Sequence, residues 1–326
     1  MKVLVTGATG FTGGHLARRL RTQGDTVRVM VRNPAQAAAL AAEGFDVVTG
    51  DLAVASTLPA ACAEMDVVYN IAALYRTAGL PDSTYRAANA TGVAALVQAA
   101  AAAGVRRVVH CSTVGVHGDI EHPPANEDAP LRPGDIYQVT KVESETLARD
   151  ASAAAGIELV IARPTGIYGP GDRRLLKLFG GVARGRFLLL GDGQIFYHLT
   201  YVDDLCDGFR LCATVPGAAG RTYILAGGEV TTLKELIAIT AEVAGVSPRV
   251  LRFPVWPVWM AGAACEAICA PFGISPPLYR RRVDFFTKSR AFDISRAKAE
   301  LGFAPTVSLR EGIGRTLEWY RAQRWI

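Results

Sequence analysis

Tyr137 and Lys141 are four residues apart in the stretch Tyr137-Gln-Val-Thr-Lys141. On a helix, residues at this spacing lie on one face, so the ammonium group of Lys141 can lie beside the phenol of Tyr137. A phenol with an ordinary pKa of about 10 transfers protons poorly near neutral pH, and a nearby cation lowers that pKa by stabilising the phenolate. The pair is therefore a candidate acid/base device. A solvated Tyr and a solvated Lys are the alternative.

A glycine-rich turn stands between the first expected strand, Lys2 to Thr6, and the first expected helix, Phe11 to Gln23. In this order, the glycines permit a tight turn, close approach of a pyrophosphate and close packing of the helix on the strand. We therefore expect a dinucleotide here. The residues expected to contact it are Gly7, Thr9, Gly10, Phe11, Thr12 and Gly13.

The end of the second expected strand indicates which dinucleotide binds. An acid at this place binds the ribose hydroxyls of NAD, whereas an arginine accommodates the additional phosphate of NADP. The strand is followed here by Arg32-Asn33-Pro34, with no acid. The planar guanidinium of Arg32 suits a phosphate. We expect NADP, with NAD as the alternative.

The first 165 residues alternate apolar runs with amphipathic or Ala-rich stretches, which predicts a parallel sheet with crossover helices. After Arg163 the rhythm changes to glycine-rich turns and shorter elements, with helices near 233–244 and 309–321. The fold class expected is α/β, a Rossmann-type doubly wound parallel sheet with a smaller C-terminal substrate lobe. We divide the chain into a dinucleotide-binding domain (1–165) and a mainly substrate-binding lobe (166–326), from which some segments return to the first domain. The expected strands are Lys2 to Thr6, Thr26 to Val31, Asp46 to Val48, Val67 to Ile71, Arg107 to Cys111 and Leu159 to Ala162; the first domain's expected helices are Phe11 to Gln23, Ala35 to Ala42, Tyr85 to Ala103 and Tyr137 to Ala155.

Composition narrows the class of protein. The chain has 326 residues, half of them hydrophobic, which is enough for a large core. Its net charge is +5, and its arginines are scattered apart from the run Arg280 to Arg282, so we expect no nucleic-acid partner. The six cysteines lack zinc or disulfide spacing, so no metal is expected. Met1 leads directly into the first strand and glycine turn, with no signal-peptide pattern, and a cytoplasmic location is expected.

Two further segments bear on partners. From Phe253 to Ser275 the only charged residue is Glu266. Three prolines in that run argue against a membrane span, which leaves a buried helix of the substrate lobe or a peripheral contact with a membrane surface. The Ala-rich helices expected at 85–103 and 137–155 are candidates for a homodimer interface as well as for simple packing on the sheet.

With these motifs the chain resembles the extended short-chain dehydrogenases/reductases, which include nucleotide-sugar epimerases and dehydratases and 3β-hydroxysteroid and dihydroflavonol oxidoreductases. The glycine spacing is that family's variant, and the stretch Val31-Arg-Asn-Pro34 is closest to its NADP-using reductases. The resemblance implies that Asp51 and Leu52 contact adenine. It also implies cofactor contacts at Tyr137, Lys141, Ala72, Ala73, Pro164 and Ile167.

The same resemblance implies a catalytic triad of Thr113, Tyr137 and Lys141. Thr113, 24 positions before Tyr137, is expected to orient the substrate oxygen, and Ser112 is the less favoured choice. Tyr137 would exchange the hydroxyl proton of a secondary alcohol while its carbon exchanges hydride with the nicotinamide, and Lys141 would lower the pKa of Tyr137. His117 stands where sugar-acting relatives have a tyrosine, which makes it and Tyr75 candidate substrate contacts.

Two departures from the nucleotide-sugar pattern concern the substrate. Gly166 replaces an asparagine, and Tyr197 replaces an arginine that holds a diphosphate in those enzymes. Losing both groups weakens the case for a nucleoside diphosphate. The first hypothesis is an NAD(P)-dependent oxidoreductase for an apolar, lipid-like alcohol or ketone. The alternatives are an epimerase for a lipid-linked or nucleotide sugar that retains its cofactor, and an NADP-binding sensor without turnover.

Overall fold

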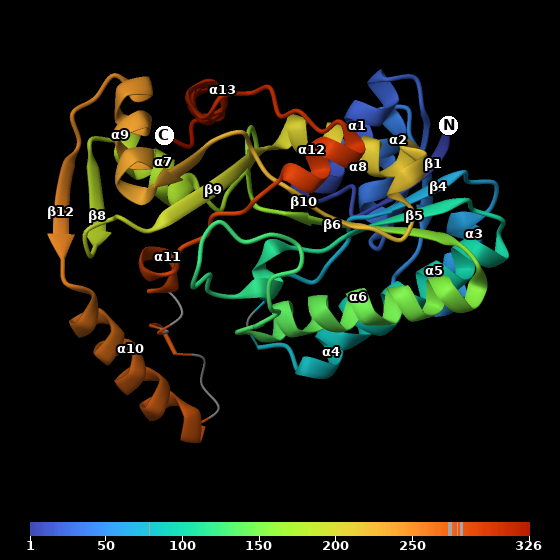
Figure 1. Cartoon of the computed structure of the whole chain (residues 1–326), viewed down its shortest axis with the longest axis horizontal. Helices are drawn as coiled ribbons and strands as arrows, with labels where there is room; N and C mark the ends of the chain where they lie inside the picture. The colour runs from blue at the N-terminus through green and yellow to red at the C-terminus, as the bar shows by residue number, and fades with distance from the viewer. Residues whose placement is uncertain (78, 273–275, 279, 281–282) are drawn as a thin grey trace.

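A seven-stranded sheet in which every strand pairs in parallel forms the centre of the fold (Figure 1). The computed structural model describes residues 1–77, 79–272, 276–278, 280 and 283–326. The strand order is β10-β6-β5-β4-β1-β2-β3, and its first six strands in chain order give the 3-2-1-4-5-6 order of a doubly wound dinucleotide-binding sheet. The expected Rossmann-type fold is confirmed. The strands are β1 (Lys2–Thr6), β2 (Thr26–Val31), β3 (Asp46–Thr49), β4 (Val67–Asn70), β5 (Arg107–Cys111), β6 (Glu158–Pro164) and β10 (Thr222–Leu225).

Helices cover both faces of this sheet, so its strands are apolar on both sides. Val3 and Val5 of β1 pack into the cluster that contains α1 and α8, whereas Leu4 between them packs into the cluster that contains α3, α5 and α6. The second group lies below the sheet in Figure 1. The helices of this part are α1 (Phe11–Thr22), α2 (Ala37–Ala42), α3 (Leu58–Cys62), α4 (Asp82–Arg86), α5 (Gly92–Ala102), α6 (Ile136–Ala155), α8 (Val202–Thr214) and α12 (Ser295–Leu301).

Segments from the second half of the chain return to this sheet. Strand β10 pairs with β6, and α8 packs beside α1. Glu300 of α12 accepts a hydrogen bond from the Tyr223 hydroxyl of β10 at 2.8 Å. The large sheet therefore takes its outermost strand, next to β6, from beyond residue 165.

A smaller lobe stands beside the carboxyl end of the sheet and has its own core, in which Phe179, Leu236 and Leu317 are buried. It contains a three-stranded sheet in the order β11-β9-β7 and a parallel pair, β12 and β8. Its elements are β7 (Gly166–Tyr168), α7 (Leu176–Ala183), β8 (Arg186–Leu190), β9 (Phe196–Tyr201), β11 (Val230–Thr232), α9 (Leu233–Ala244), β12 (Arg249–Phe253), α10 (Val255–Cys269), α11 (Asp284–Thr287) and α13 (Leu309–Ala322).

Helix α10 projects from this lobe, at the lower left of Figure 1. Gly262 is its only buried residue, so the expectation of a buried lobe helix is wrong. With the short turn that follows it, the helix spans 18 residues, Val255–Phe272, and is long and apolar enough to cross a membrane by length and composition. The end of the expected apolar run at Ser275, the neighbouring Tyr279, and Arg281 and Arg282 of the expected basic run lie outside the described residues.

Candidate active site

One large cleft, about 1220 Å³ in volume, opens at the carboxyl ends of the sheet strands. This is where a doubly wound sheet places its ligands. The glycine turn and the segments after β2, β4, β5 and β6 line one part of it, and α7 and residues 284–292 line the other. Its volume exceeds the roughly 300 to 1,000 Å³ of a typical small-ligand pocket, so a dinucleotide and a second molecule can share it.

The glycine turn has no room for side chains. Gly7 has a φ of +73°, and a Cβ on it would lie 2.8 Å from the amide nitrogen of Ala72. A Cβ on Gly13 would lie 2.3 Å from the carbonyl oxygen of Gly7. Helix α1 begins directly after Gly10, its N-cap, which offers no side chain to cap the helix. The first amide donors of α1 therefore remain available at the cleft, which fits the pyrophosphate of a dinucleotide.

The other expected cofactor residues line the same cleft. Arg32 is exposed after β2 and has no ion pair within the part of the chain that the structure describes. Asp51 is held by its own turn, in which its carboxylate accepts a hydrogen bond from the amide of Ala53 at 2.9 Å. The remaining residues expected from the sequence that line the cleft are Thr9, Phe11, Thr12, Leu52, Ala72, Ala73, Pro164 and Ile167.

Tyr137 lines the cleft from the first turn of α6. Asp135 caps that turn, because its carboxylate accepts a hydrogen bond from the amide of Gln138 at 2.9 Å. The ring of Tyr137 meets the ring of Tyr75 edge to face, with centroids 4.8 Å apart. Burial raises the pKa of Tyr137, and the guanidinium of Arg76, 5.9 Å from its ring centroid, acts in the opposite direction.

Lys141 is almost fully buried one turn further along α6, with 1 % of its surface exposed. Its Nζ donates to the carbonyl oxygen of Cys111 at 2.6 Å. Burial lowers the pKa of Lys141. The cations that lower the pKa of Tyr137 in this arrangement are Arg76 and Arg174, and burial outweighs them. The pKa of Tyr137 is therefore raised, contrary to the expectation that a neighbouring Lys141 would lower it.

Thr113 and Ser112 face different partners at the end of β5. Thr113 lines the cleft, and its Oγ1 accepts a hydrogen bond from the amide of Gly115 at 3.0 Å. The Ser112 hydroxyl donates to the buried carboxylate of Glu145 at 2.5 Å. Glu145 in turn pairs with Arg163 through two hydrogen bonds, at 2.9 and 2.6 Å. The structure thus brings Thr113 to the same cleft as Tyr137, whereas the hydroxyl of Ser112 is bound to Glu145.

A series of buried hydrogen bonds joins β1 to α6, the helix that carries Tyr137 and Lys141, beneath the cleft. The Thr6 hydroxyl donates to Asn70 Oδ1 at 2.8 Å, and the Asn70 amide donates to His110 Nδ1 at 3.1 Å. His110 Nε2 lies 3.0 Å from Ser144 Oγ, which donates to the carbonyl of Lys141 at 2.7 Å. These partners fix His110 as the neutral tautomer with hydrogen on Nε2. Burial, followed by the charge of Lys141, lowers the pKa of His110 and agrees with this assignment. The sequence did not predict this series of hydrogen bonds, because its members come from three strands and a helix that are far apart in the sequence.

Three of the four expected substrate residues line the cleft: Tyr75, Gly166 and Tyr197. His117 does not. It is 1 % exposed, its Nδ1 donates to the carbonyl of Ala129 at 3.1 Å, and its Nε2 accepts from Arg163 at 3.2 Å. Because both ring nitrogens are used inside the protein, the expectation that His117 touches the substrate is not met in this structure.

The substrate lobe adds residues that the sequence did not single out. Aromatic side chains form part of the cleft wall: Phe187, Phe285 and Phe286. Lys177 and Arg290 also line it and have no ion pair among the residues described. They come from α7 and from the segment after α11, and only the folded chain brings them together.

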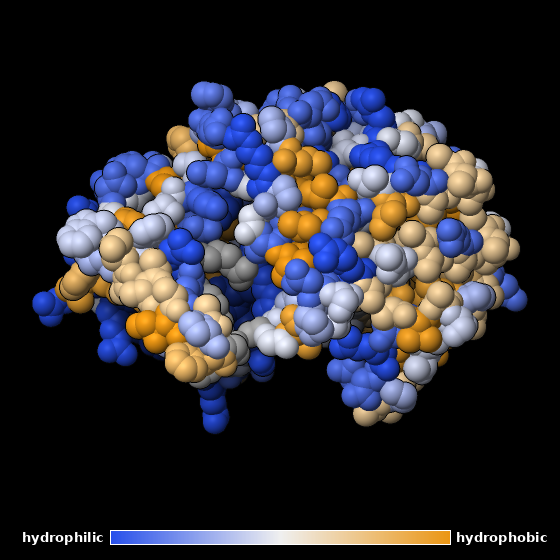
Figure 2. All heavy atoms as spheres, turned by 90° about the horizontal axis from the view of Figure 1, so that it is seen from below, coloured by the Kyte–Doolittle hydropathy of each residue, from blue (hydrophilic) through white to orange (hydrophobic). Residues whose placement is uncertain are grey.

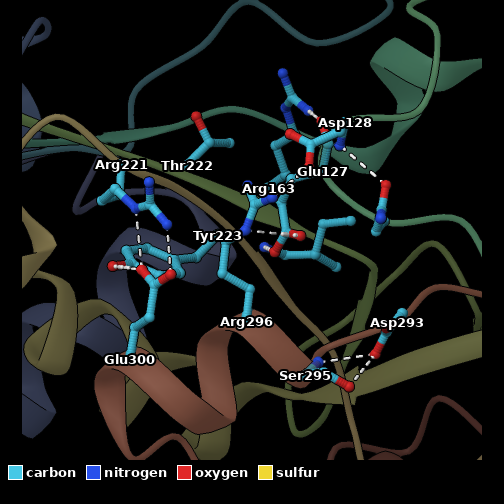
Figure 3. Close-up of polar contacts among 12 residues, drawn as sticks. Glu127, Asp128, Arg163, Arg221, Thr222, Tyr223, Asp293, Ser295, Arg296 and Glu300 are labelled. Carbon is cyan, nitrogen blue, oxygen red and sulfur yellow. Dashed lines mark hydrogen bonds and ion pairs between the residues drawn. The ribbon is translucent and has the colours of Figure 1, made fainter.

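A second, smaller hollow of about 210 Å³ is lined by four arginines, two acids, Gly220 and Thr222, and Figure 3 shows polar contacts in this region. Its arginines already have partners. Arg221 binds Glu300 at 2.5 Å, Arg296 binds Asp128, and Arg163 binds Glu145. The hollow is thus lined by ion pairs within the chain, of which Arg163–Glu145 is buried and Arg221–Glu300 is exposed, and the exposed pair joins the residue before β10 to α12.

The sequence model described as the NAD dependent epimerase/dehydratase family matches residues 3–226. The chain belongs to this family. It is therefore an enzyme of the extended short-chain dehydrogenase/reductase type. It is 31% identical to the 2-alkyl-3-oxoalkanoate reductase of Stenotrophomonas maltophilia (strain K279a), over 97% of this chain and 98% of that protein. It is 30% identical to the dTDP-glucose 4,6-dehydratase of Streptomyces griseus, over 99% of this chain and 94% of that protein.

Among solved structures, the family member superposes on MoeE5 in complex with UDP-glucuronic acid and NAD, with a TM-score of 0.76 and 27% identity. The match covers 99% of this chain and 100% of that one. The relatives thus include a protein named as a reductase of 2-alkyl-3-oxoalkanoates and one named as a dehydratase of a nucleotide sugar. Membership establishes NAD-dependent family chemistry, and the residues of the cleft must identify the substrate.

Proposed function

We propose that this family member is an NADP-linked oxidoreductase that transfers hydride reversibly at a secondary alcohol or ketone carbon of an apolar, lipid-like molecule. The observation that carries the proposal is the aromatic wall that Phe187, Phe285 and Phe286 give the cleft. Such a wall favours hydrocarbon, at about 25 cal/mol per Å² of apolar surface removed from water. The name of the related 2-alkyl-3-oxoalkanoate reductase, which describes a ketone with alkyl chains and a carboxylate, supports a lipid-like substrate.

Tyr137 and Thr113 have different roles at the substrate oxygen. The bound dinucleotide supplies the group that accepts or donates hydride. Tyr137 Oη removes the hydroxyl proton when an alcohol is oxidised and returns it when a ketone is reduced. Thr113 Oγ1 accepts the amide hydrogen of Gly115, so its own hydrogen remains to be donated to the substrate oxygen.

Lys141 contributes hydrogen-bond donors from beneath the cleft. An ammonium group has three donors, and the carbonyl of Cys111 takes one of them. Lys141 Nζ also lies 3.3 Å from His110 Nε2, but in the tautomer assigned above that nitrogen carries a hydrogen and donates to Ser144, which leaves ammonium donors for Tyr137 or a ribose hydroxyl. Tyr137→Phe removes the proton carrier, and because acid/base assistance contributes about 10² to 10⁴ in rate, turnover should fall by that factor while cofactor affinity is kept.

The proposed NADP preference depends on Arg32. The test compares NADPH and NADH dissociation constants by nucleotide fluorescence for the wild type and Arg32→Asp, with Arg324→Asp as a control of equal charge change. Hydrogen bonds to a charged group contribute about 1.5 to 3 kcal/mol, so the NADPH/NADH affinity ratio should fall at least tenfold in Arg32→Asp. An unchanged ratio would refute the role of Arg32.

A second candidate function is epimerisation of a lipid-linked or nucleotide sugar with a retained cofactor. The unpaired cations Lys177 and Arg290 favour it, since they suit a phosphate-bearing substrate. Arg290 interacts with Tyr197, the residue that stands where nucleotide-sugar enzymes have an arginine. The dTDP-glucose 4,6-dehydratase relative supports this reading in the same way.

A turnover balance separates the candidates. Purified protein is offered NADPH with a panel of alkyl ketones and, separately, a panel of nucleotide sugars and polyprenyl-phosphate sugars, with Tyr137→Phe as the blank. A reductase consumes one NADPH per alcohol formed, and an epimerase converts its sugar with no net absorbance change. Tight NADPH binding without turnover of either panel would support the sensor alternative.

For quaternary structure and location we propose a cytoplasmic homodimer that pairs through α5 and α6. Figure 2 shows a broad apolar area on this side of the molecule, at the right of the view. All six cysteines are free thiols, which suits a reducing compartment. Sedimentation of the wild type against Leu147→Glu, a half-buried position on α6, tests the interface: the substitution should yield monomers.

A further inference from the structure

We propose that α10, together with the strand pair β8 and β12 that leads into it, forms a limb that docks the protein on the surface of an anionic membrane without crossing it. This docking limb consists of residues 186–190 and 249–272. It lies outside the catalytic cleft residues, apart from Phe187, and its role does not depend on which substrate the cleft takes.

The helix of the docking limb is apolar on all sides and yet exposed. Trp256 is 70% exposed, Ile268 67% and Phe272, just beyond the helix, 73%. A helix that is apolar all round is normally buried in a core or in a membrane. Its only charged residue, Glu266, is neutralised by Arg280, whose Nε lies 2.7 Å from the carboxylate. The surface therefore needs an apolar environment that the protein itself does not provide.

The strand pair extends the same apolar surface. Leu188 of β8 is the direct partner of Leu251 of β12, and they are 50% and 48% exposed. Phe253, two residues after Leu251 and so on the same face, is 55% exposed. Figure 2 shows apolar colours gathered over this part of the molecule, at the left of the view. The apolar surface is thus continuous from one face of the strands to the helix.

Positive charge borders this surface. Arg186 and Arg249 are direct partners on the two strands, two residues before Leu188 and Leu251, and therefore lie on the same face. Both are exposed, and neither has an ion pair within the described part of the chain. Trp256 and Trp259 stand at the start of the helix, and tryptophan is favoured at the boundary between headgroups and hydrocarbon. Apolar side chains bordered by unpaired arginines match a bilayer with anionic lipids.

The charges also favour a bilayer over a second copy of the chain. In a symmetric dimer the same patch meets itself, and the limb holds no acid except Glu266, which Arg280 already neutralises, so Arg186 and Arg249 would be buried without a counter-charge. Unpaired charges oppose such an interface, whereas anionic headgroups attract them. The arginine pair therefore assigns the limb to lipid.

The path of the chain indicates docking and excludes a single crossing. The 18 residues Val255–Phe272 would span about 27 Å as a helix, close to the roughly 30 Å of a hydrocarbon core. Arg280, however, folds back on the helix, where its amide binds Glu266 at 2.8 Å and its guanidinium lies 5.5 Å from the ring of Trp259. By Val283, which is 2% exposed, the chain is again in the protein interior. The limb leaves the body and returns to it on one side.

Vesicle sedimentation tests the proposal with the full-length chain. Vesicles of phosphatidylcholine alone and of phosphatidylcholine with phosphatidylglycerol are compared for the wild type, Trp256→Gln/Trp259→Gln and Arg186→Gln/Arg249→Gln. Val54→Thr, which alters an exposed apolar residue elsewhere, and Arg321→Gln/Arg324→Gln, which removes two exposed charges elsewhere, are the matched controls. Thermal unfolding and NADPH binding confirm that every variant is folded.

We expect the wild type to bind anionic vesicles more tightly than neutral ones. The double substitution Trp256→Gln/Trp259→Gln should lower binding to both kinds of vesicle by roughly tenfold or more for each tryptophan replaced, because each replacement removes a large apolar surface. The double substitution Arg186→Gln/Arg249→Gln should lower binding to anionic vesicles only, by about fivefold for each arginine replaced. Wild-type protein that binds neither vesicle would overturn the proposal, as would tryptophan variants that bind like the controls. A tryptophan variant that converts a dimer to a monomer in sedimentation would assign the limb to a second copy.

Discussion

Replacing Arg163 by methionine tests whether the buried pair between Arg163 and Glu145 stabilises the fold at the end of β5, beside Thr113. Both side chains are 5% exposed, and Glu145 accepts two hydrogen bonds from Arg163 and one from Ser112, the neighbour of Thr113. Burial alone would raise the pKa of Glu145, but the hydrogen bonds and charge of Arg163 outweigh it and lower that pKa. Arg163→Met leaves a buried carboxylate without its cation, which costs about 3 to 5 kcal/mol of unfolding free energy.

Arg221 provides a matched control in the same region (Figure 3). It also binds a glutamate through two nitrogens, at 3.0 and 2.5 Å, but it is exposed to water. Exposed pairs are screened and contribute little, so Arg221→Met should leave stability almost unchanged. The assay is urea unfolding followed by tryptophan fluorescence at pH 8, 7, 6 and 5.

The pH series tests the direction in which the stability deficit of Arg163→Met changes with pH. In the wild type the folded pKa of Glu145 lies below its unfolded value of about 4.3, so the pair's contribution is complete above that value and is lost as pH falls through the folded pKa. In Arg163→Met, burial without the cation raises the folded pKa instead. The deficit of the variant should then be largest at pH 8 and shrink toward pH 5. Equal losses for the two methionine variants, or a deficit that does not change with pH, would refute the reasoning.

Three further predictions concern the glycine turn, the buried series of hydrogen bonds and the acid/base. Gly13→Ala places a Cβ 2.3 Å from the Gly7 carbonyl, so we expect a loss of about 1 to 3 kcal/mol in stability and at least tenfold in NADPH affinity by fluorescence titration, whereas Gly217→Ala, with no atom within 4 Å of its new Cβ, should change neither. His110→Leu leaves the Asn70 amide without its acceptor and should cost about 1 to 3 kcal/mol in urea unfolding, with a larger loss in kcat than in NADPH affinity; an unchanged kcat would limit His110 to a structural role. Because burial raises the pKa of Tyr137 above its ordinary value, ketone reduction should stay constant to about pH 10 while alcohol oxidation keeps rising with pH in stopped-flow rates. A plateau of oxidation below pH 9 would contradict this last prediction.

The sequence predicted best what is decided within one segment. The turn from Gly7 to Gly13 follows from the local need for residues without side chains, and the two Cβ approaches of 2.8 and 2.3 Å show why. The alternation of strands and helices predicted the six strands β1 to β6 because buried parallel strands are apolar on both faces. The spacing of Tyr137 and Lys141 predicted one helix face.

What the sequence did not reveal depends on contacts between distant segments. The long helix expected from Tyr85 to Ala103 is divided into α4, a wider turn at Ala87–Thr91, and α5. The sequence predicted His117 as a substrate contact, but in the fold its Nε2 accepts a hydrogen bond from the distant Arg163. Arg76 reaches Tyr137 from the segment after β4, and no spacing rule connects the two residues.

The origin of β10 affects how the chain folds during synthesis and how it tolerates truncation. A chain that ends near residue 165 contains the glycine turn and the proposed triad, yet it lacks β10, which pairs with β6, and the helix α8, which packs against α1, β5 and β6. Its unpaired strand edge would be free to pair with other chains. On the ribosome, the sheet cannot close before residue 225 has emerged. Expression of the first half alone should therefore yield aggregates, and the two lobes should unfold together as one cooperative unit.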